Sequence, residues 1–394
     1  MTALRPAFAR LFAASQYGFP FLPGPAPTPV ARLRRLTGPA RLPKRRKWLR
    51  GPAYIGMLCI WPFGALFMAT RLEAPNPRAG RRRRIFGAWW LAMTRNVPPF
   101  EYQAYHLDVP SRRADLHEYL FWTDQPAIAE LNRRRGAIMR DVQDKARFSE
   151  ICSAHGLPCV PSLAVFRSGK QVAPELPFVP TDMEFWAKSL AGSGAQGAAL
   201  WRREGEFYSN DTGMRLSAQA LASYLSRTDS IVQPWLTNHP RLAEVTNGAL
   251  ASVRILTGID AASRAAVVTA MIYLPSRDRT TSIASIACAI DLVSGTLTRA
   301  VDLQAGSIDI EHHPDTGERI VGRVLPFWSE SLALAVRAHE SAFARFAFLG
   351  WDLALTPNGP VLLEANAGWG ALHLQMLNGP IGLTDFSRIL ADHV

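Results

Sequence analysis

The sequence predicts a mixed α and β (α+β) fold that follows a basic N-terminal segment. Of the 394 residues, 48% are hydrophobic and 19% are charged, a globular composition that excludes a disordered or collagen-like chain. From about residue 97, segments with helical spacing of apolar residues alternate with short runs of branched residues. Four cysteines without a CxxC pair argue against a disulfide framework and a zinc ribbon, and favour a reducing compartment.

The N-terminal segment, residues 1–96, is set apart by its charge. Residues 1–84 carry 17 lysines and arginines and one acid, Glu73, whereas the rest of the chain is mildly acidic. The uncharged stretch 51–70 is long enough to span a bilayer, but prolines and glycines interrupt it and both flanks are basic. We expect residues 32–84 to attach to an anionic surface on the cytoplasmic face of a membrane. Packing of the stretch on the body and a true span stay open as alternatives. Nucleic acid is disfavoured as a partner, because the aromatic residues are not interleaved with the basic ones.

The elements of the body follow from local patterns. Helices are expected at 115–128 and at 143–155, the second ending before Gly156 and Pro158. Strands are expected at 162–166, 185–188 and 198–202, then a helix at 217–225, then strands at 231–235, 251–257 and 265–273. Apolar residues at helical spacing predict a long helix at 329–346. A hairpin of strands 350–356 and 361–364, turned at Asn358-Gly359, and a closing helix complete the chain.

The C-terminal hairpin carries the most informative polar residues. Asp352 lies in its first strand, and Glu364 and Asn366 lie at the end of its second. On paired strands these three side chains can converge. Two carboxylates and an amide are hard oxygen ligands of the kind that magnesium prefers. The alternative is that the two acids are solvated residues on a strand face.

Three basic side chains are candidates for phosphate contacts. Lys188 ends an apolar strand and precedes a loop of small residues at 191–197, whose backbone N–H groups could approach phosphate oxygens. An ordinary glycine-rich hairpin would look similar. Arg254 occupies the centre of an apolar strand, where a charge requires a partner, either a phosphate or a carboxylate. Lys145, on the second expected helix, would on its own be taken for a surface lysine.

In this order the pieces resemble the ATP-grasp superfamily, and the closest resemblance is to its sugar-transfer-associated group. The resemblance covers roughly residues 95–385. Besides the lysines, Arg254 and the hairpin residues, the motifs that carry it are Gln233-Pro234-Trp235-Leu236, Ser252-Val253-Arg254-Ile255-Leu256-Thr257, His313-Pro314-Asp315-Thr316-Gly317, Leu325-Pro326-Phe327-Trp328, Gly350-Trp351-Asp352 and Gly359-Pro360-Val361-Leu362-Leu363-Glu364-Ala365-Asn366. Each motif is weak alone, and the set is specific.

The resemblance implies an ATP-grasp fold, in which two α+β subdomains hold ATP. The corresponding region is 97–385, with a helical part at 97–160, a lid subdomain at 161–235 and a metal and phosphate subdomain at 236–385, before a C-terminal end at 386–394. Lys145 and Lys188 would contact ATP, Arg254 would act with Lys188 on the transferred phosphoryl group, and the metal ion would be Mg²⁺ or Mn²⁺. The residues that this resemblance assigns to the lid are Gly192, Ser193, Gly194 and Gly197, those at the adenine edge are Val232, Gln233, Pro234 and Trp235, and those on the metal are Asp352, Glu364 and Asn366.

The function that the resemblance implies is an ATP- and magnesium-dependent carboxylate–amine ligase that forms ADP. The carboxylate is activated as an acyl phosphate, which an amine or another nucleophile attacks, and either substrate could be linked to a sugar or a lipid. Two alternatives stay open: a kinase of the same fold that phosphorylates a hydroxyl, and a membrane-associated nucleotide-binding protein without catalysis. Gln233 stands at a position that is often acidic in the superfamily, and 280–287 is richer in serine and alanine than expected for an acceptor loop. Neither substrate can be identified from these residues.

Overall fold

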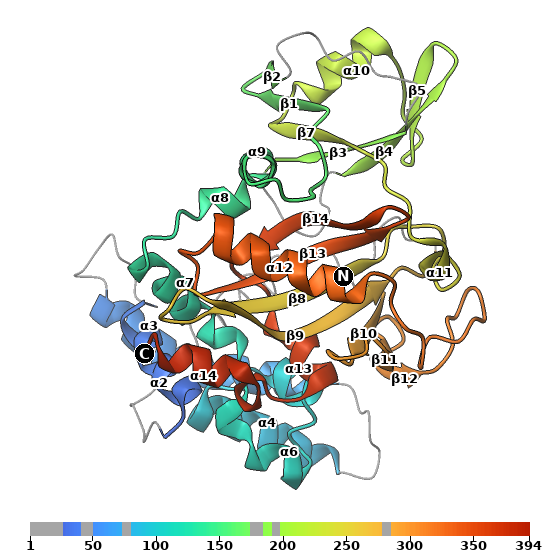
Figure 1. The fold of residues 1–394 in the computed structure, drawn as a ribbon. Coiled ribbons are helices and arrows are strands. Elements are labelled where there is room, and N and C mark those ends of the chain that lie inside the picture. Colours follow the sequence, from blue (N-terminus) through green and yellow to red (C-terminus); the bar gives the residue numbers. More distant parts are fainter. Residues whose placement is uncertain (1–26, 41–49, 73–79, 174–183, 191–197, 278–284) are drawn as a thin grey trace.

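The computed structural model describes residues 27–40, 50–72, 80–173, 184–190, 198–277 and 285–394. Within these ranges the chain forms two seven-stranded antiparallel sheets and a group of N-terminal helices. Figure 1 shows the smaller sheet at one end of the molecule, the larger sheet in the middle and the helices beyond it.

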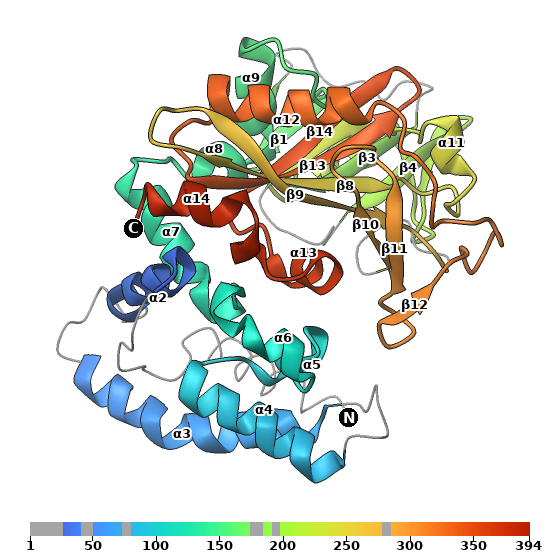
Figure 2. The same ribbon diagram turned by 60° about the horizontal axis from the view of Figure 1, so that its bottom comes forward.

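The larger sheet has the strand order β12-β11-β10-β9-β8-β13-β14. Its strands are β8 (Ser252–Ile259), β9 (Ala265–Leu274), β10 (Ile286–Ile290), β11 (Leu297–Asp302), β12 (Ile308–Ile310), β13 (Phe348–Thr356) and β14 (Gly359–Asn366). Apolar clusters lie on both of its faces, and β13 is therefore buried along its whole length. Helix α12 (Trp328–Ala342) covers one face, and α13 (Ala371–Asn378), η4 (Ile381–Leu383) and α14 (Asp385–Ala391) cover the other (Figure 2). The short helix α11 (Pro240–Ala243) precedes β8.

The smaller sheet has the order β2-β1-β7-β3-β4-β5-β6. Its strands are β1 (Ala164–Arg167), β2 (Lys170–Ala173), β3 (Phe185–Ser189), β4 (Ala199–Glu204), β5 (Phe207–Asn210), β6 (Arg215–Ser217) and β7 (Ser230–Pro234). Helix α10 (Ala218–Leu225) packs Leu221 and Leu225 against its apolar face, beside Trp201. The strands and the helix expected between residues 162 and 273 are confirmed to within a few residues.

The N-terminal segment is helical where it is described. Its helices are α2 (Pro29–Ala40), α3 (Arg50–Thr70), α4 (Arg81–Arg95), α5 (Pro99–Ala104) and α6 (Pro110–Ala114). α3 continues through Pro62 as one helix, so the proline and glycines of 51–70 do not divide it. Among the described residues, no helix combines the length and the hydropathy needed to cross a membrane.

One of the two helices expected in the region that leads to the sheets differs from the structure. The expected helix 115–128 is wrong: 3₁₀ turns η2 (Leu116–Glu118) and η3 (Trp122–Asp124) precede α7 (Gln125–Arg134). Pro126 lacks an N–H and suits the first turn of a helix, so the helix begins there. The expected helix 143–155 is confirmed as α9 (Lys145–Ala154), which Asp144 caps, and a separate short helix, α8 (Arg140–Gln143), precedes it.

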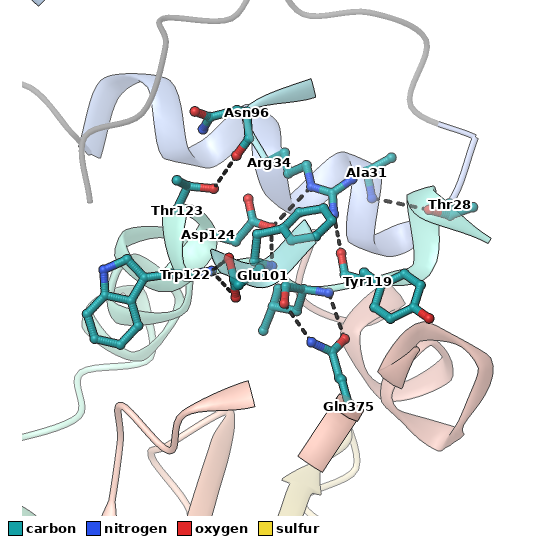
Figure 3. A network of polar contacts seen from close by, with 12 residues as sticks. Thr28, Ala31, Arg34, Asn96, Glu101, Tyr119, Trp122, Thr123, Asp124 and Gln375 are labelled. Atoms are coloured by element: carbon teal, nitrogen blue, oxygen red, sulfur yellow. Dashed lines mark hydrogen bonds and ion pairs between the residues drawn. The ribbon is translucent and has the colours of Figure 1, made fainter. Parts of the chain in front are cut away.

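A buried polar network joins the N-terminal helices to the body (Figure 3). Glu101, 1% exposed, accepts hydrogen bonds from Tyr105 Oη (3.2 Å) and from the backbone N–H of Trp122 (3.0 Å to each oxygen). Gln375 of α13 donates to Tyr105 Oη (2.9 Å) and to the carbonyl of Leu120 (2.7 Å). Burial raises the pKa of Glu101 to about 8, against the opposing effect of the Trp122 N–H. The network therefore holds a protonated carboxyl at neutral pH.

α2 is attached to the same network through a charged side chain. Arg34 pairs with Asp124, with 3.1 Å between Nε and Oδ2, and also donates to the carbonyl of Tyr119. Val30 and Leu33 of α2 are fully buried against the body. Part of the basic segment is thus a structural component of the body.

Candidate active site

The candidate site lies where the smaller sheet meets the β13–β14 edge of the larger one (Figure 1). On the larger sheet, Asp352 of β13 pairs in register with Arg254 of β8 on one side and with Glu364 of β14 on the other. Residues paired across antiparallel strands project to the same face, so this register alone brings the three charged side chains together. The convergence that the hairpin predicted is present.

Arg254 and Asp352 form a two-pronged ion pair. The distances are 2.8 Å from Nε to Oδ1 and 2.7 Å from Nη2 to Oδ2, and Nη1 donates to the carbonyl of Trp369 at 3.2 Å. Burial acts to lower the pKa of Arg254, but the charge and hydrogen bonds of Asp352 outweigh it and the pKa is raised. The charge expected at the centre of this strand is therefore compensated by a carboxylate within the protein.

The two carboxylates are linked by an amide. Asn366 Nδ2 lies 3.3 Å from Asp352 Oδ2 and 3.2 Å from Glu364 Oε1. Burial and then the charge of Asp352 raise the pKa of Glu364, while Lys145 and the Asn366 hydrogen bond lower it. Two acids held this close in a buried place attract positive charge.

Two lysines supply part of that charge from other elements. The carboxylate of Asp144 caps α9 by accepting from the N–H groups of Ala146 and Arg147 at 3.2 Å, which makes Lys145 the first residue of the helix. Lys145 Nζ lies 3.9 Å from Glu364 Oε2. Lys145, taken alone for a surface lysine, is thus largely buried in the site.

Lys188 enters the site from β3 of the smaller sheet, where it pairs in register with Ile231 of β7. Burial lowers its pKa to about 8, and the positive charge of Lys145 acts in the same direction. The negative charges of Glu364 and Asp352 act to raise it. The site therefore combines Lys145, Lys188 and Arg254 with two acids, and its cations come from three different elements.

The strand expected at the adenine edge is β7 and the residue after it. Gln233 is buried, with Nε2 at 3.5 Å from the carbonyl of Val160. The carbonyl of Val232 accepts from Leu163 N (2.8 Å), the N–H of Trp235 donates to Glu184 O (3.1 Å), and Pro234 has no N–H. These backbone groups already have protein partners, so their assignment to the adenine edge stays a prediction.

The residues assigned to the lid, Gly192, Ser193, Gly194 and Gly197, lie outside the described residues, as does 280–284 of the stretch assigned to the acceptor loop. Their roles stay predictions.

A tyrosine and a histidine form a buried pair near Arg254. Tyr273 Oη lies 2.7 Å from His373 Nδ1, and the Arg254 guanidinium lies 5.9 Å from the Tyr273 ring centroid. Burial lowers the pKa of His373 to about 4 and raises that of Tyr273 to about 12, so both groups are neutral at pH 7. Neither Tyr273 nor His373 is among the candidate site residues named from the sequence, although the sequence holds a signal for Tyr273. Residues two apart in a strand project to the same face, so Tyr273 lies on the same face of β9 as Met271. Met271 is the residue that pairs with Arg254 across β8 and β9.

The donor set fits a magnesium ion. Two carboxylates and one amide supply hard oxygen atoms, since the Oδ1 atom of Asn366 can take the place of its Nδ2 by rotation of the amide. Among the described residues, no group of three or more His, Cys, Asp and Glu side chains is arranged to hold a metal.

Comparison with known proteins bears on the family of this chain. Residues 127–388 match the family model described as sugar-transfer associated ATP-grasp. No curated protein matches the sequence. Similar solved structures include a biotin carboxylase from Campylobacter jejuni (12% identity, TM-score 0.40, 68% of this chain and 52% of that one), an L-amino acid ligase from Bacillus licheniformis (11%, 0.37, 64% and 48%) and the VanG D-Ala:D-Ser ligase from Enterococcus faecalis (14%, 0.34, 68% and 62%). The chain spans only about half the length of similar solved structures.

Proposed function

The chain belongs to the sugar-transfer associated ATP-grasp family, and we propose that it is an ATP- and magnesium-dependent ligase that joins a carboxylate to an amine. The observation that supports this most directly is the convergence of Lys145, Lys188 and Arg254 on the carboxylates of Asp352 and Glu364. Phosphoryl transfer needs positive charge around the transferred group, and these elements would supply it.

The proposed reaction has two steps. A carboxylate oxygen of the substrate attacks the γ-phosphorus of ATP, the bond to the β,γ-bridging oxygen breaks, and ADP leaves. The resulting acyl phosphate is attacked at its carbonyl carbon by the amine, which expels inorganic phosphate and loses a proton to give the amide. ATP, a carboxylate and an amine are thereby converted to ADP, phosphate and an amide.

The positions of the cations suggest a separate role for each. Lys188 and Lys145 would contact phosphate oxygens of ATP and its adenine side. Arg254 is held by both oxygens of Asp352, so its guanidinium is fixed in orientation before the substrate binds. It would act with Lys188 on the charge that develops on the transferred phosphoryl group.

Asp352, Glu364 and Asn366 are the residues that would hold the metal ion, Mg²⁺ or Mn²⁺. When bound, the ion would supply Lewis-acid neutralisation of phosphate charge. The raised pKa of Glu364 agrees with this role, because a carboxyl that is costly to ionise alone becomes favourable to ionise beside a cation.

For the substrates we propose a chemical class, and for the protein a location at a membrane. The family description associates the group with sugar transfer, which favours a sugar- or lipid-linked acceptor for one of the substrates. We also propose that residues 32–84 hold the protein at the anionic cytoplasmic face of a membrane, since they carry 15 lysines and arginines against a single acid, Glu73.

The test is a thermal-shift titration of the whole protein with ATP and magnesium. We expect a magnesium-dependent rise of the melting temperature that Glu364→Gln abolishes and that Glu206→Gln, at an exposed position, retains. No shift in the folded wild-type protein would exclude both the ligase and the kinase. If the nucleotide binds, the products of reactions with candidate carboxylates and amines decide between them, because only a ligase forms an amide.

A further inference from the structure

The outer side of the α3–α4 pair is apolar, although it is exposed to water. On α3, Ile60 is 64% exposed and Phe63 is 76% exposed, with Leu66 and Phe67 beside them. On α4, Phe86 is 61% exposed and Trp90 is 52% exposed. Large apolar side chains gathered in this way on an exposed face mark an interaction surface.

The opposite sides of the same helices explain why these residues stay outside. Small and apolar side chains, among them Ala65 and Ala92, pack α3 against α4. Trp61 Nε1 donates to the carbonyl of Ala92 at 3.3 Å, and Trp89 Nε1 donates to that of Pro62 at 3.1 Å. The two helices lie side by side along one edge of the molecule (Figure 2), away from the candidate active site. Their shared contacts use the inner faces and leave the outer aromatic residues available.

The end of the pair where α3 stops and α4 begins is strongly basic. Arg71 stacks over Phe67, with its guanidinium 4.5 Å from the ring centroid, and Arg81 Nη2 donates to the carbonyl of Thr70 at 3.4 Å. Arg82 and Arg83 are exposed next to them. Neither helix contains an acidic residue. An apolar face with a basic end is complementary to a surface that is apolar inside and anionic outside.

We propose that the outer face of α3 and α4 lies in the interface of an anionic lipid bilayer, with Ile60, Phe63, Phe86 and Trp90 among the acyl chains and Arg82 and Arg83 at the headgroups. This inference rests on the membrane attachment in the proposed function and names the residues that perform it. The residues that contact the membrane therefore differ from the predicted segment 32–84. Arg34 is removed from them because it forms the ion pair with Asp124, and Phe86 and Trp90 of α4 are added. The helices lie in the plane of the membrane and do not cross it.

Flotation of the whole protein with lipid vesicles tests this surface. We expect the wild-type protein to bind vesicles that contain phosphatidylglycerol and not vesicles of phosphatidylcholine alone, and to lose binding as salt is added. Phe63→Ser with Phe86→Ser should lower the partition coefficient at least tenfold. The matched control is Val293→Ser with Leu383→Ser, two positions that are 94% and 64% exposed elsewhere, and it should bind as the wild type does.

A second pair of variants tests the charge. Arg82→Ser with Arg83→Ser should lower binding about thirtyfold at low salt, because each arginine contributes about 1 kcal/mol, whereas Arg337→Ser should not change it. Each variant should retain the nucleotide-dependent thermal shift, which shows that it is folded. If the wild-type protein shows no such shift, the proposed ligase activity is excluded and the proposed membrane surface is not. Wild-type protein that stays unbound, or a Phe63 and Phe86 variant that binds as the wild type does, would overturn the proposal. The proposal would also be overturned if the wild-type protein bound no vesicles and formed a dimer that the same substitutions dissociate.

Discussion

Glu101→Gln should remove much of the dependence of stability on pH in this protein. Glu101 is buried, and its pKa is raised from 4.5 to about 8. Between these values the folded protein keeps the proton while the unfolded chain releases it. The contribution of this group to stability is therefore fully present below pH 4.5 and is lost as the pH rises through 8.

The size of the effect follows from proton linkage. One proton released on unfolding lowers the free energy of unfolding by about 1.4 kcal/mol per pH unit. Between pH 5.5 and pH 7.5, which both lie between the two pKa values, the free energy of unfolding of the wild-type protein should therefore fall by roughly 3 kcal/mol because of Glu101. Glutamine resembles the protonated carboxyl in shape and can still accept from Trp122 and Tyr105, so the variant keeps the network without the titration.

The assay is urea denaturation at the two pH values for the wild-type protein and for Glu101→Gln. The variant should gain stability relative to the wild type as the pH rises, and Glu206→Gln, which alters an exposed carboxylate, should run parallel to the wild type. Parallel pH dependence in Glu101→Gln and wild type would refute the reasoning, because it would mean that Glu101 ionises in the folded state as it does in the unfolded chain.

Two further predictions concern the core of the larger sheet. At Gly350 an added Cβ would lie 2.5 Å from the Cβ of Trp369, so Gly350→Ala should lower the free energy of unfolding by about 1–3 kcal/mol in urea denaturation; an unchanged midpoint would contradict this contact. Arg254→Met leaves the Asp352 carboxylate buried without its partner and should cost about 3–5 kcal/mol, and adding Asp352→Asn should recover part of that loss. Additive effects in this double-mutant cycle would show that the two side chains do not interact.

Local patterns were sufficient for most elements of the body. The branched runs at 251–257 and 265–273 became β8 and β9, and the turn at Asn358-Gly359 joins β13 to β14. Family membership and the ATP-grasp fold are likewise confirmed. The expected helix 143–155 is α9, which Asp144 caps. The expected helix 115–128 failed because apolar spacing does not reveal where a proline permits the first turn.

The candidate site depends on contacts between distant residues, which local sequence patterns do not predict. The sequence indicated that Arg254 needs a partner and that Asp352, Glu364 and Asn366 could converge. It did not say that Asp352 is that partner, 98 residues away, or that Lys145 lies against Glu364. The pair of Tyr273 and His373 depends on β9 and α13 meeting, which no local pattern records.

The sequence by itself determined the periodicity of the elements, the turn residues and the order of the charged side chains, because these depend on neighbours along the chain. The tertiary structure decided which charges pair, which carboxyl stays protonated and which aromatic residues of α3 and α4 remain outside. Burial and electrostatic interactions depend on distances in space, and strand register and helix packing set those distances only once the whole chain has folded.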